Sequence, residues 1–118
     1  MPSNFYVLTP TAKQHLREAK AWSLARWGSE LTTKYFDDLE KTAVYLAKNY
    51  KKLTKRKDLT GNSELGIYPI REHYIVYVPY GKEKIAIVSI IRQGRDIPAL
   101  LSKHSFLIHR ELSKIKKP

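Results

Sequence analysis

The feature that most constrains the fold is the apolar run KIAIVSIIR at residues 84–92, in which nearly every side chain is β-branched or aliphatic. A run without polar alternation predicts a strand buried on both faces. It stops abruptly at Arg92-Gln93-Gly94-Arg95-Asp96, which is followed by Ile97-Pro98. Two arginines and an aspartate at the exit of the most apolar strand predict a functional edge.

Two further strands precede this run. Residues 64–71 contain Pro69, which cannot donate a ladder hydrogen bond, so this strand is predicted at a sheet edge. Residues 73–80, HYIVYVPY, are aromatic and β-branched, and Gly81-Lys82-Glu83 supplies a hairpin turn before the apolar run. Consecutive hairpins make these three strands an antiparallel meander. A short strand at residues 4–8 is expected to join the same sheet.

Two helices are predicted between the first strand and the meander. The first begins at Thr9-Pro10, an N-cap followed by proline at the first helical position, and ends at Gly28. The second takes Ser29 as its cap and carries apolar residues at helical spacing as far as Ala47. Because the connection is so short, the helices are expected to form an antiparallel hairpin on one face of the sheet.

These elements predict one α+β domain spanning residues 1–118. We interpret Trp22 and Trp27, which lie on the first helix, as core residues. Residues 50–62, YKKLTKRKDLTGN, are predicted as a basic loop. It serves either to dock phosphates or as a solvated connector.

Residues 98–118 predict a C-terminal helical extension that Asp96 can cap. Four apolar residues share one helical face, and basic residues occupy the opposite face, so the extension is a basic amphipathic helix. The apolar positions are Leu101, Ile108, Leu112 and Ile115, and the basic ones are Lys103, Arg110, Lys114 and Lys117. Such a helix lies on a partner, on anionic lipid or back on its own domain.

The positive charge is concentrated in one half of the chain. The formal net charge is +11 over 118 residues, and fifteen of the 22 basic residues lie in residues 51–118, against six of the 11 acidic ones. A basic half of this kind points to a polyanionic partner, a membrane surface or an acidic protein.

Composition and motif searches also set limits. With no cysteine, disulfides and thiolate chemistry are excluded. There is no apolar run of about 20 residues, the length that crosses a bilayer. No signal peptide is visible, so we expect a cytoplasmic protein without a membrane partner. No phosphate-binding, dinucleotide-binding or zinc motif occurs, so neither a cofactor nor a metal is expected.

Metal-free cleavage of RNA requires a base, a cation for the phosphorane and an acid. Arg71, Arg92 and Arg95 are candidate cations, and His104, His73 or Tyr77 are candidates for proton transfer. These are suitable residue types rather than an arrangement, so the pattern leaves catalysis open.

Two blocks of sequence together resemble a known family. The first is LTPTAKQHLREAKAWSLARWG at residues 8–28, and the second is RDIP at residues 95–98, preceded by REHYIVYVPY and IAIVSIIRQG. They are similar to the ParE toxins of the RelE/ParE superfamily of type II toxin–antitoxin modules. The matching positions of the first block are Leu8, Thr9, Pro10, Ala12, Leu16, Arg26, Trp27 and Gly28. His15 stands where the family often has aspartate, and the resemblance ends near residue 101.

The resemblance implies a small toxin that a cognate, ParD-like antitoxin neutralises in a hetero-oligomer. ParE toxins act on DNA gyrase, block replication and are not thought to be enzymes. RelE toxins share the fold and cut messenger RNA in the ribosome, which makes a ribonuclease the alternative. An inactive homologue that only binds the antitoxin is the third possibility.

Site residues follow from this resemblance. We expect the target to contact Arg71, Arg92, Arg95 and Asp96, although Asp96 has a competing role as a helix cap. The ribonuclease alternative would use Arg71, Arg92, Arg95 and His104. For the antitoxin we expect Leu39, Leu46 and Tyr77, which serve equally well as core residues.

Overall fold

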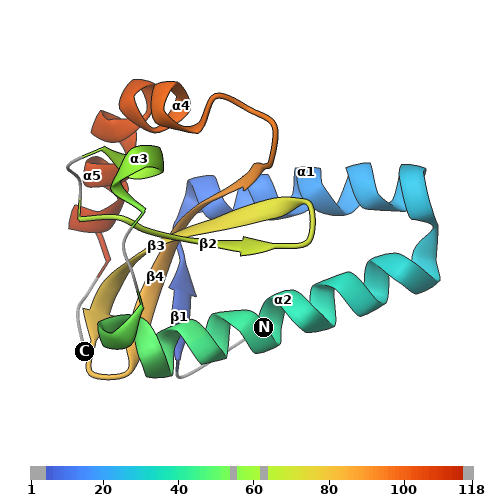
Figure 1. Cartoon of the computed structure of the whole chain (residues 1–118), viewed down its shortest axis with the longest axis horizontal. Helices are drawn as coiled ribbons and strands as arrows, with labels where there is room; N and C mark the ends of the chain where they lie inside the picture. Colours follow the sequence, from blue (N-terminus) through green and yellow to red (C-terminus); the bar gives the residue numbers. More distant parts are fainter. Residues whose placement is uncertain (1–4, 54–55, 62–63, 116–118) are drawn as a thin grey trace.

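The fold of residues 5–53, 56–61 and 64–115 is described by a computed structural model. A short strand leads into two long helices, a 3₁₀ turn and a one-turn helix follow, and three strands and two further short helices complete the described residues (Figure 1). The elements are β1 (Tyr6–Leu8), α1 (Pro10–Trp27), α2 (Ser29–Asn49), the 3₁₀ turn η1 (Tyr50–Lys52), α3 (Lys57–Thr60), β2 (Gly66–Ile70), β3 (His73–Gly81), β4 (Lys84–Arg92), α4 (Ile97–Lys103) and α5 (Ser105–Ser113).

The four strands form one sheet in the order β1-β4-β3-β2. The predicted antiparallel meander of β2, β3 and β4 is confirmed, and β1 joins β4 in parallel, so the sheet is mixed. The apolar run is β4, buried from Ile85 to Ile91. β2 lies at the edge with Pro69 exposed, as the missing N–H requires.

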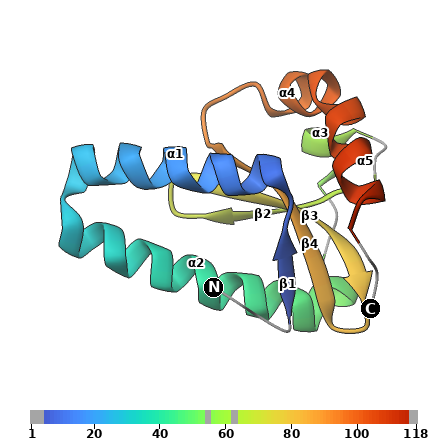
Figure 2. The same ribbon diagram turned by 180° about the vertical axis from the view of Figure 1, so that it is seen from behind.

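Helices cover both faces of the sheet. The hairpin of α1 and α2 lies on one side, and α4 and α5 lie on the other (Figures 1 and 2). The two faces bury separate apolar clusters because side chains of a strand alternate between faces. The hairpin side includes Ala12, Tyr35, Leu39, Leu46, Ile75, Ile85 and Ile87. The opposite side includes Ile67, Val76, Val88, Ile91, Leu101 and Ile108.

The helix boundaries follow the predicted signals with one exception. The Thr9 hydroxyl accepts from the backbone N–H of Ala12 at 3.1 Å, which confirms the first cap. Gly28 ends α1 at φ +83°, and its N–H donates to Leu24 O. Ser29 was expected to cap α2 but is its first helical residue, and Gly28 takes the cap position without a side-chain bond. A connection of one residue leaves no room for a separate cap.

The C-terminal extension folds back on its own domain. The prediction of one continuous helix is wrong, because the backbone of His104 leaves the helical conformation at φ −100° and ψ 5°. Its N–H bonds the carbonyls of both Leu100 and Ser102, which closes α4 before α5 begins. Leu101 and Ile108 are buried, as the predicted apolar face requires. Lys117 lies outside the described residues.

The predicted basic loop is partly helical. Residues 50–52 form a 3₁₀ turn, and residues 57–60 form α3. Arg56 pairs with Asp58 at 2.8 Å next to the first turn of α3. Thr54, Lys55 and Asn62 lie outside the described residues, as does Asn4 of the predicted first strand. None of the helices in the described part of the chain has the length and apolar character that a membrane span requires.

Candidate functional site

Hydrogen bonds from Gln93 bring two strand ends to one corner of the sheet. Gln93 follows β4, and its backbone N–H donates to Glu72 O at 2.8 Å. Its side-chain amide donates to Arg71 O at 2.8 Å and to His73 O at 3.0 Å. Arg71 adopts φ +48° in the turn between β2 and β3. Gln93 therefore holds that turn against the end of β4, and Arg71 and Arg92 line one open hollow.

The ring of Trp22 organises this corner. The guanidinium carbon of Arg26 lies 5.1 Å from the ring centroid, and that of Arg92 lies 5.4 Å from it. Both distances are within the range of a cation–π contact. Trp27 and His73 approach the same ring edge-on, at centroid distances of 5.3 and 5.6 Å. Arg26 and Arg92 contact this ring, Arg71 lines the same hollow, and Arg95 lies two residues after Gln93. We name these four residues the arginine corner.

The arginine corner carries excess positive charge. Arg71 is paired with Asp38, its Nε lying 3.2 Å from Oδ2. Arg26, Arg92 and Arg95 have no carboxylate within 4 Å among the residues that the structure describes. All three are exposed, so they are available to an external anion.

A second, more enclosed cavity adjoins the open hollow and shares Trp22 and Arg92 with it. Its volume is about 380 Å³, and it lies between α1, the end of β4 and α4. We name it the histidine pocket. Its lining comprises His15, Glu18, Ala19, Trp22, His73, Ser89, Ile90, Ile91, Arg92, Arg95, Leu100 and His104.

The orientation of His15 in this pocket is fixed by the edge of β4. Its Nδ1 accepts from the backbone N–H of Ile90 at 3.2 Å, and the Ser89 hydroxyl lies 3.0 Å from the same nitrogen. A backbone N–H can only donate, so Nδ1 carries no proton and the neutral ring bears its proton on Nε2. Burial lowers the pKa of His15 and favours this neutral form.

His73 is anchored from the opposite side. Its Nδ1 bonds the hydroxyl of Tyr35, a buried residue of α2. Burial lowers the pKa of His73 and raises that of Tyr35, so both groups stay neutral near pH 7. The neutral His73 ring is held by Tyr35 and packs against the ring of Trp22, so we assign it a structural role rather than that of a free acid or base.

Comparison with known proteins identifies the family. A sequence model described as "ParE toxin of type II toxin-antitoxin system, parDE" matches residues 6–97, which is most of the chain. The chain belongs to the ParE toxin family of type II toxin–antitoxin systems. A solved structure described as "Chromosomal ParDE TA system from P. aeruginosa" shares the fold at a TM-score of 0.61 and 17% sequence identity. The match covers 74% of this chain and 92% of that chain. No curated protein matches in sequence.

Membership of the ParE family implies a cognate antitoxin as partner. The family match ends at residue 97, where α4 begins, so nearly all of α4 and α5 lie beyond it. The histidine pocket therefore has one wall from the family region and one wall, Leu100 and His104, from the extension.

The residues predicted for target binding and catalysis are partly brought together. Arg92, Arg95 and His104 line the histidine pocket, whereas Arg71 lies in the adjoining hollow and is tied to Asp38. Asp96 acts as the cap of α4, accepting from Ala99 N at 3.2 Å.

The residues predicted for antitoxin binding are internal. Leu39, Leu46 and Tyr77 have relative exposures of 8%, 0% and 5%, and all three belong to the core cluster under the hairpin. Burial raises the pKa of Tyr77 accordingly. Their burial supports the other interpretation, that they are core residues. Among the described residues of the hairpin, the exposed large apolar side chains are Leu24, Leu31 and Tyr45.

Sequence reasoning missed four residues of this region: His15, Trp22, Arg26 and Ser89. His15, Trp22 and Arg26 are seven and four residues apart, a spacing that places them on one face of a helix. That spacing was the available signal. The interpretation of both tryptophans as core is right for Trp27, which packs against the hairpin core, and wrong for Trp22. The described residues include no group of three potential metal ligands.

Proposed function

We propose that the chain is the toxin of a type II toxin–antitoxin module and that it inhibits DNA gyrase by binding through the arginine corner, without covalent chemistry of its own. The observation that supports this proposal is a group of exposed arginines. Arg26 and Arg92 lie over the ring of Trp22, Arg95 lines the adjoining pocket, and none of the three has a carboxylate partner in the described residues. Gyrase in action holds DNA, whose phosphates attract such a surface.

The hydrogen bonds of two pocket histidines, His15 and His73, favour binding over catalysis. His15 uses Nδ1 to satisfy a backbone N–H, and His73 uses Nδ1 for Tyr35. Neither nitrogen is available to take a proton from a substrate. Residues 98–118 would then be an extension of the ParE fold that borders the target surface.

A ribonuclease is the second candidate function. One observation favours it: Arg92, Arg95 and His104 line a single cavity, which a cation and a proton-transfer group require. Arg71, the fourth predicted member, lies outside that cavity, paired with Asp38. The two functions differ in which cellular process stops first.

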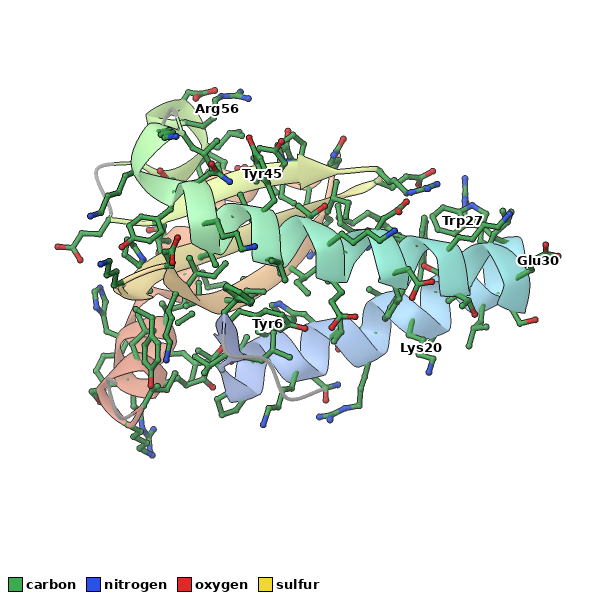
Figure 3. All side chains as sticks on the ribbon, turned by 90° about the horizontal axis from the view of Figure 1, so that it is seen from below. Tyr6, Lys20, Trp27, Glu30, Tyr45 and Arg56 are labelled. Atoms are coloured by element: carbon green, nitrogen blue, oxygen red, sulfur yellow. The ribbon has the colours of Figure 1, made fainter. Side chains whose placement is uncertain are left out.

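For the antitoxin we propose a contact with the exposed apolar side chains of the hairpin. Leu24 and Leu31 flank the connection between α1 and α2, and Tyr45 extends toward the edge of the sheet, where its ring lies 5.9 Å from that of Tyr68 (Figure 3). Lys20 and Lys48 are also exposed on these helices, so an acidic segment would be matched in charge.

Induced expression in a bacterial host tests the proposal. Incorporation of labelled thymidine and of a labelled amino acid is followed in the first minutes. DNA synthesis should fall first. The double variant Arg92→Gln/Arg95→Gln should lose this effect, while Arg17→Gln, at an exposed arginine of α1 outside the corner, should keep it. If protein synthesis stops at once and DNA synthesis continues, the ribonuclease candidate replaces this one. Expression without growth arrest would instead indicate an inactive antitoxin-binding homologue.

A further inference from the structure

We propose that the histidine pocket is a binding site for the phosphate group of a nucleotide, completed by the C-terminal extension. The site is formed by Arg92 and Arg95 on one side, His15 on a second and His104 on a third. The proposal concerns a small ligand and stands whether or not gyrase is the target.

The arginines supply the charge. Arg92 and Arg95 both line the pocket, and their guanidinium groups lack a carboxylate partner within 4 Å in the described part of the chain. A guanidinium offers several N–H donors in a fixed plane that matches two oxygens of a phosphate. Arg92 is also positioned by Trp22, whose ring centroid lies 5.4 Å away.

His15 supplies a directed neutral donor. Its Nδ1 is occupied by the Ile90 N–H, so the proton resides on Nε2. His15 also lines the cavity, so Nε2–H is the group that it offers there. The bond to Ile90 fixes the ring before any ligand arrives, which reduces the entropy lost on binding.

The extension supplies the remaining wall and is fastened to the start of α1. Glu111 of α5 accepts from the backbone N–H of Thr11 at 3.2 Å and from its hydroxyl at 2.8 Å. Buried Leu101 and Ile108 hold the two short helices on the sheet. Together they place His104, at the junction of α4 and α5, at the cavity that α1 and β4 leave open.

The balance of charges favours an anion. Glu18 is the single carboxylate in the lining, and it accepts from the side-chain amide of Gln14 at 3.2 Å. The lining also contains two positive charges, those of Arg92 and Arg95, so the cavity has a net positive charge even when the histidines are neutral. The volume, about 380 Å³, is sufficient for a phosphate and part of its nucleoside.

The test is an NMR titration of the full-length chain at pH 7, following the imidazole C–H signals of all four histidines. The probes are inorganic phosphate, 5′-AMP, a thymidine dinucleotide and adenosine. Saturable shifts of His15 and His104, with His109 unmoved, are expected for the phosphate-bearing probes. Tighter binding of 5′-AMP indicates a free nucleotide as the source, and tighter binding of the dinucleotide indicates a nucleic-acid backbone. Adenosine should leave these signals unchanged.

Matched variants decide whether the pocket is responsible. Arg95→Gln and His104→Gln should each weaken binding about tenfold, a loss of one charge-assisted contact. Arg110→Gln and His109→Gln, at exposed positions of α5 outside the pocket, should bind like the parent. Equal weakening in the controls, no saturable shift with any phosphate probe, or equal shifts with adenosine would each overturn the proposal. Unchanged binding in both pocket variants would do the same.

Discussion

The side chain of His15 takes the place of a neighbouring strand for Ile90. β1 pairs with β4 only from Ile85 to Ile87, and beyond that point the edge of β4 faces α1. Thr9 bonds the carbonyls of Ile87 and Val88, at 3.1 and 3.4 Å, and His15 accepts the N–H of Ile90 at 3.2 Å. The edge of β4 beyond the short parallel strand is thus satisfied by the backbone N–H and hydroxyl of Thr9, the cap of α1, and by the side chain of His15.

Replacing His15 by leucine should lower the free energy of unfolding by about 1–3 kcal/mol, because the buried Ile90 N–H loses its acceptor. His15→Asn places an amide oxygen near the position of Nδ1 and should retain most of the stability. Urea denaturation of the three proteins measures both effects. Equal losses in the two variants would show that the bond to Ile90 contributes nothing specific.

Stability should decline as the pH falls below about 6.5. Burial lowers the pKa of His15 and His73 from their ordinary value of 6.5 in the folded protein. Their contribution is complete above the unfolded pKa and is lost as the pH falls from there through the folded pKa, since the unfolded chain binds the protons first. The free energy of unfolding of His15→Asn should depend less on pH in this range. If the free energy of unfolding depends on pH equally in parent and variant, His15 does not contribute to the pH dependence.

Gly66 is predicted to be intolerant of any side chain. It pairs with Tyr77 across β2 and β3, and a Cβ at Gly66 would come within 2.5 Å of the Tyr77 ring. Tyr77 is 5% exposed, so the ring cannot turn away freely. Gly66→Ala should cost about 1–3 kcal/mol by thermal or urea unfolding. In a protein that already carries Tyr77→Leu, Gly66→Ala should lower the free energy of unfolding much less than it does in the parent. If the effects of the two changes add, contact with the Tyr77 ring is not the cause.

The link between Glu111 and Thr11 should fasten the extension. Glu111→Ala removes two hydrogen bonds to a charged acceptor and leaves an N–H of the first turn of α1 without its partner. We expect the free energy of unfolding to fall by about 1–2 kcal/mol. Amide exchange in α5 should be faster than in the parent, while exchange in α2 should change less. Thr11→Val should reproduce part of the loss, and the two changes should not add. Unaltered exchange in α5 would show that the apolar contacts alone hold it.

Much of the fold follows from local signals. Helix α1 is marked at both ends, by the Thr9-Pro10 start and by Gly28. The strand β4 is marked by its uninterrupted apolar run. Each of these signals lies within the element that it specifies. The break at His104 carries no such signal, because glycine and proline are absent there and the bend depends on the surface beneath.

The site was less accessible to sequence reasoning. Arg92 and Arg95 could be predicted because they lie where the apolar strand β4 ends. The positions of His15 and Trp22 depend on how α1 lies along β4, which is a tertiary relationship. Leu39 and Leu46 illustrate the converse, since apolar residues of an amphipathic helix predict burial but do not say whether the chain itself or a partner covers them.

A gyrase cleavage assay tests most directly whether the arginine corner acts on DNA gyrase. Purified chain is incubated with DNA gyrase, ATP and supercoiled plasmid, and linear DNA is measured after denaturation of the enzyme. Linear DNA should accumulate with the parent and with Arg17→Gln, and Arg92→Gln/Arg95→Gln should require at least about tenfold more protein for the same effect. Absence of linear DNA with the parent, or equal potency of the double variant, would contradict the claim that the arginine corner acts on gyrase.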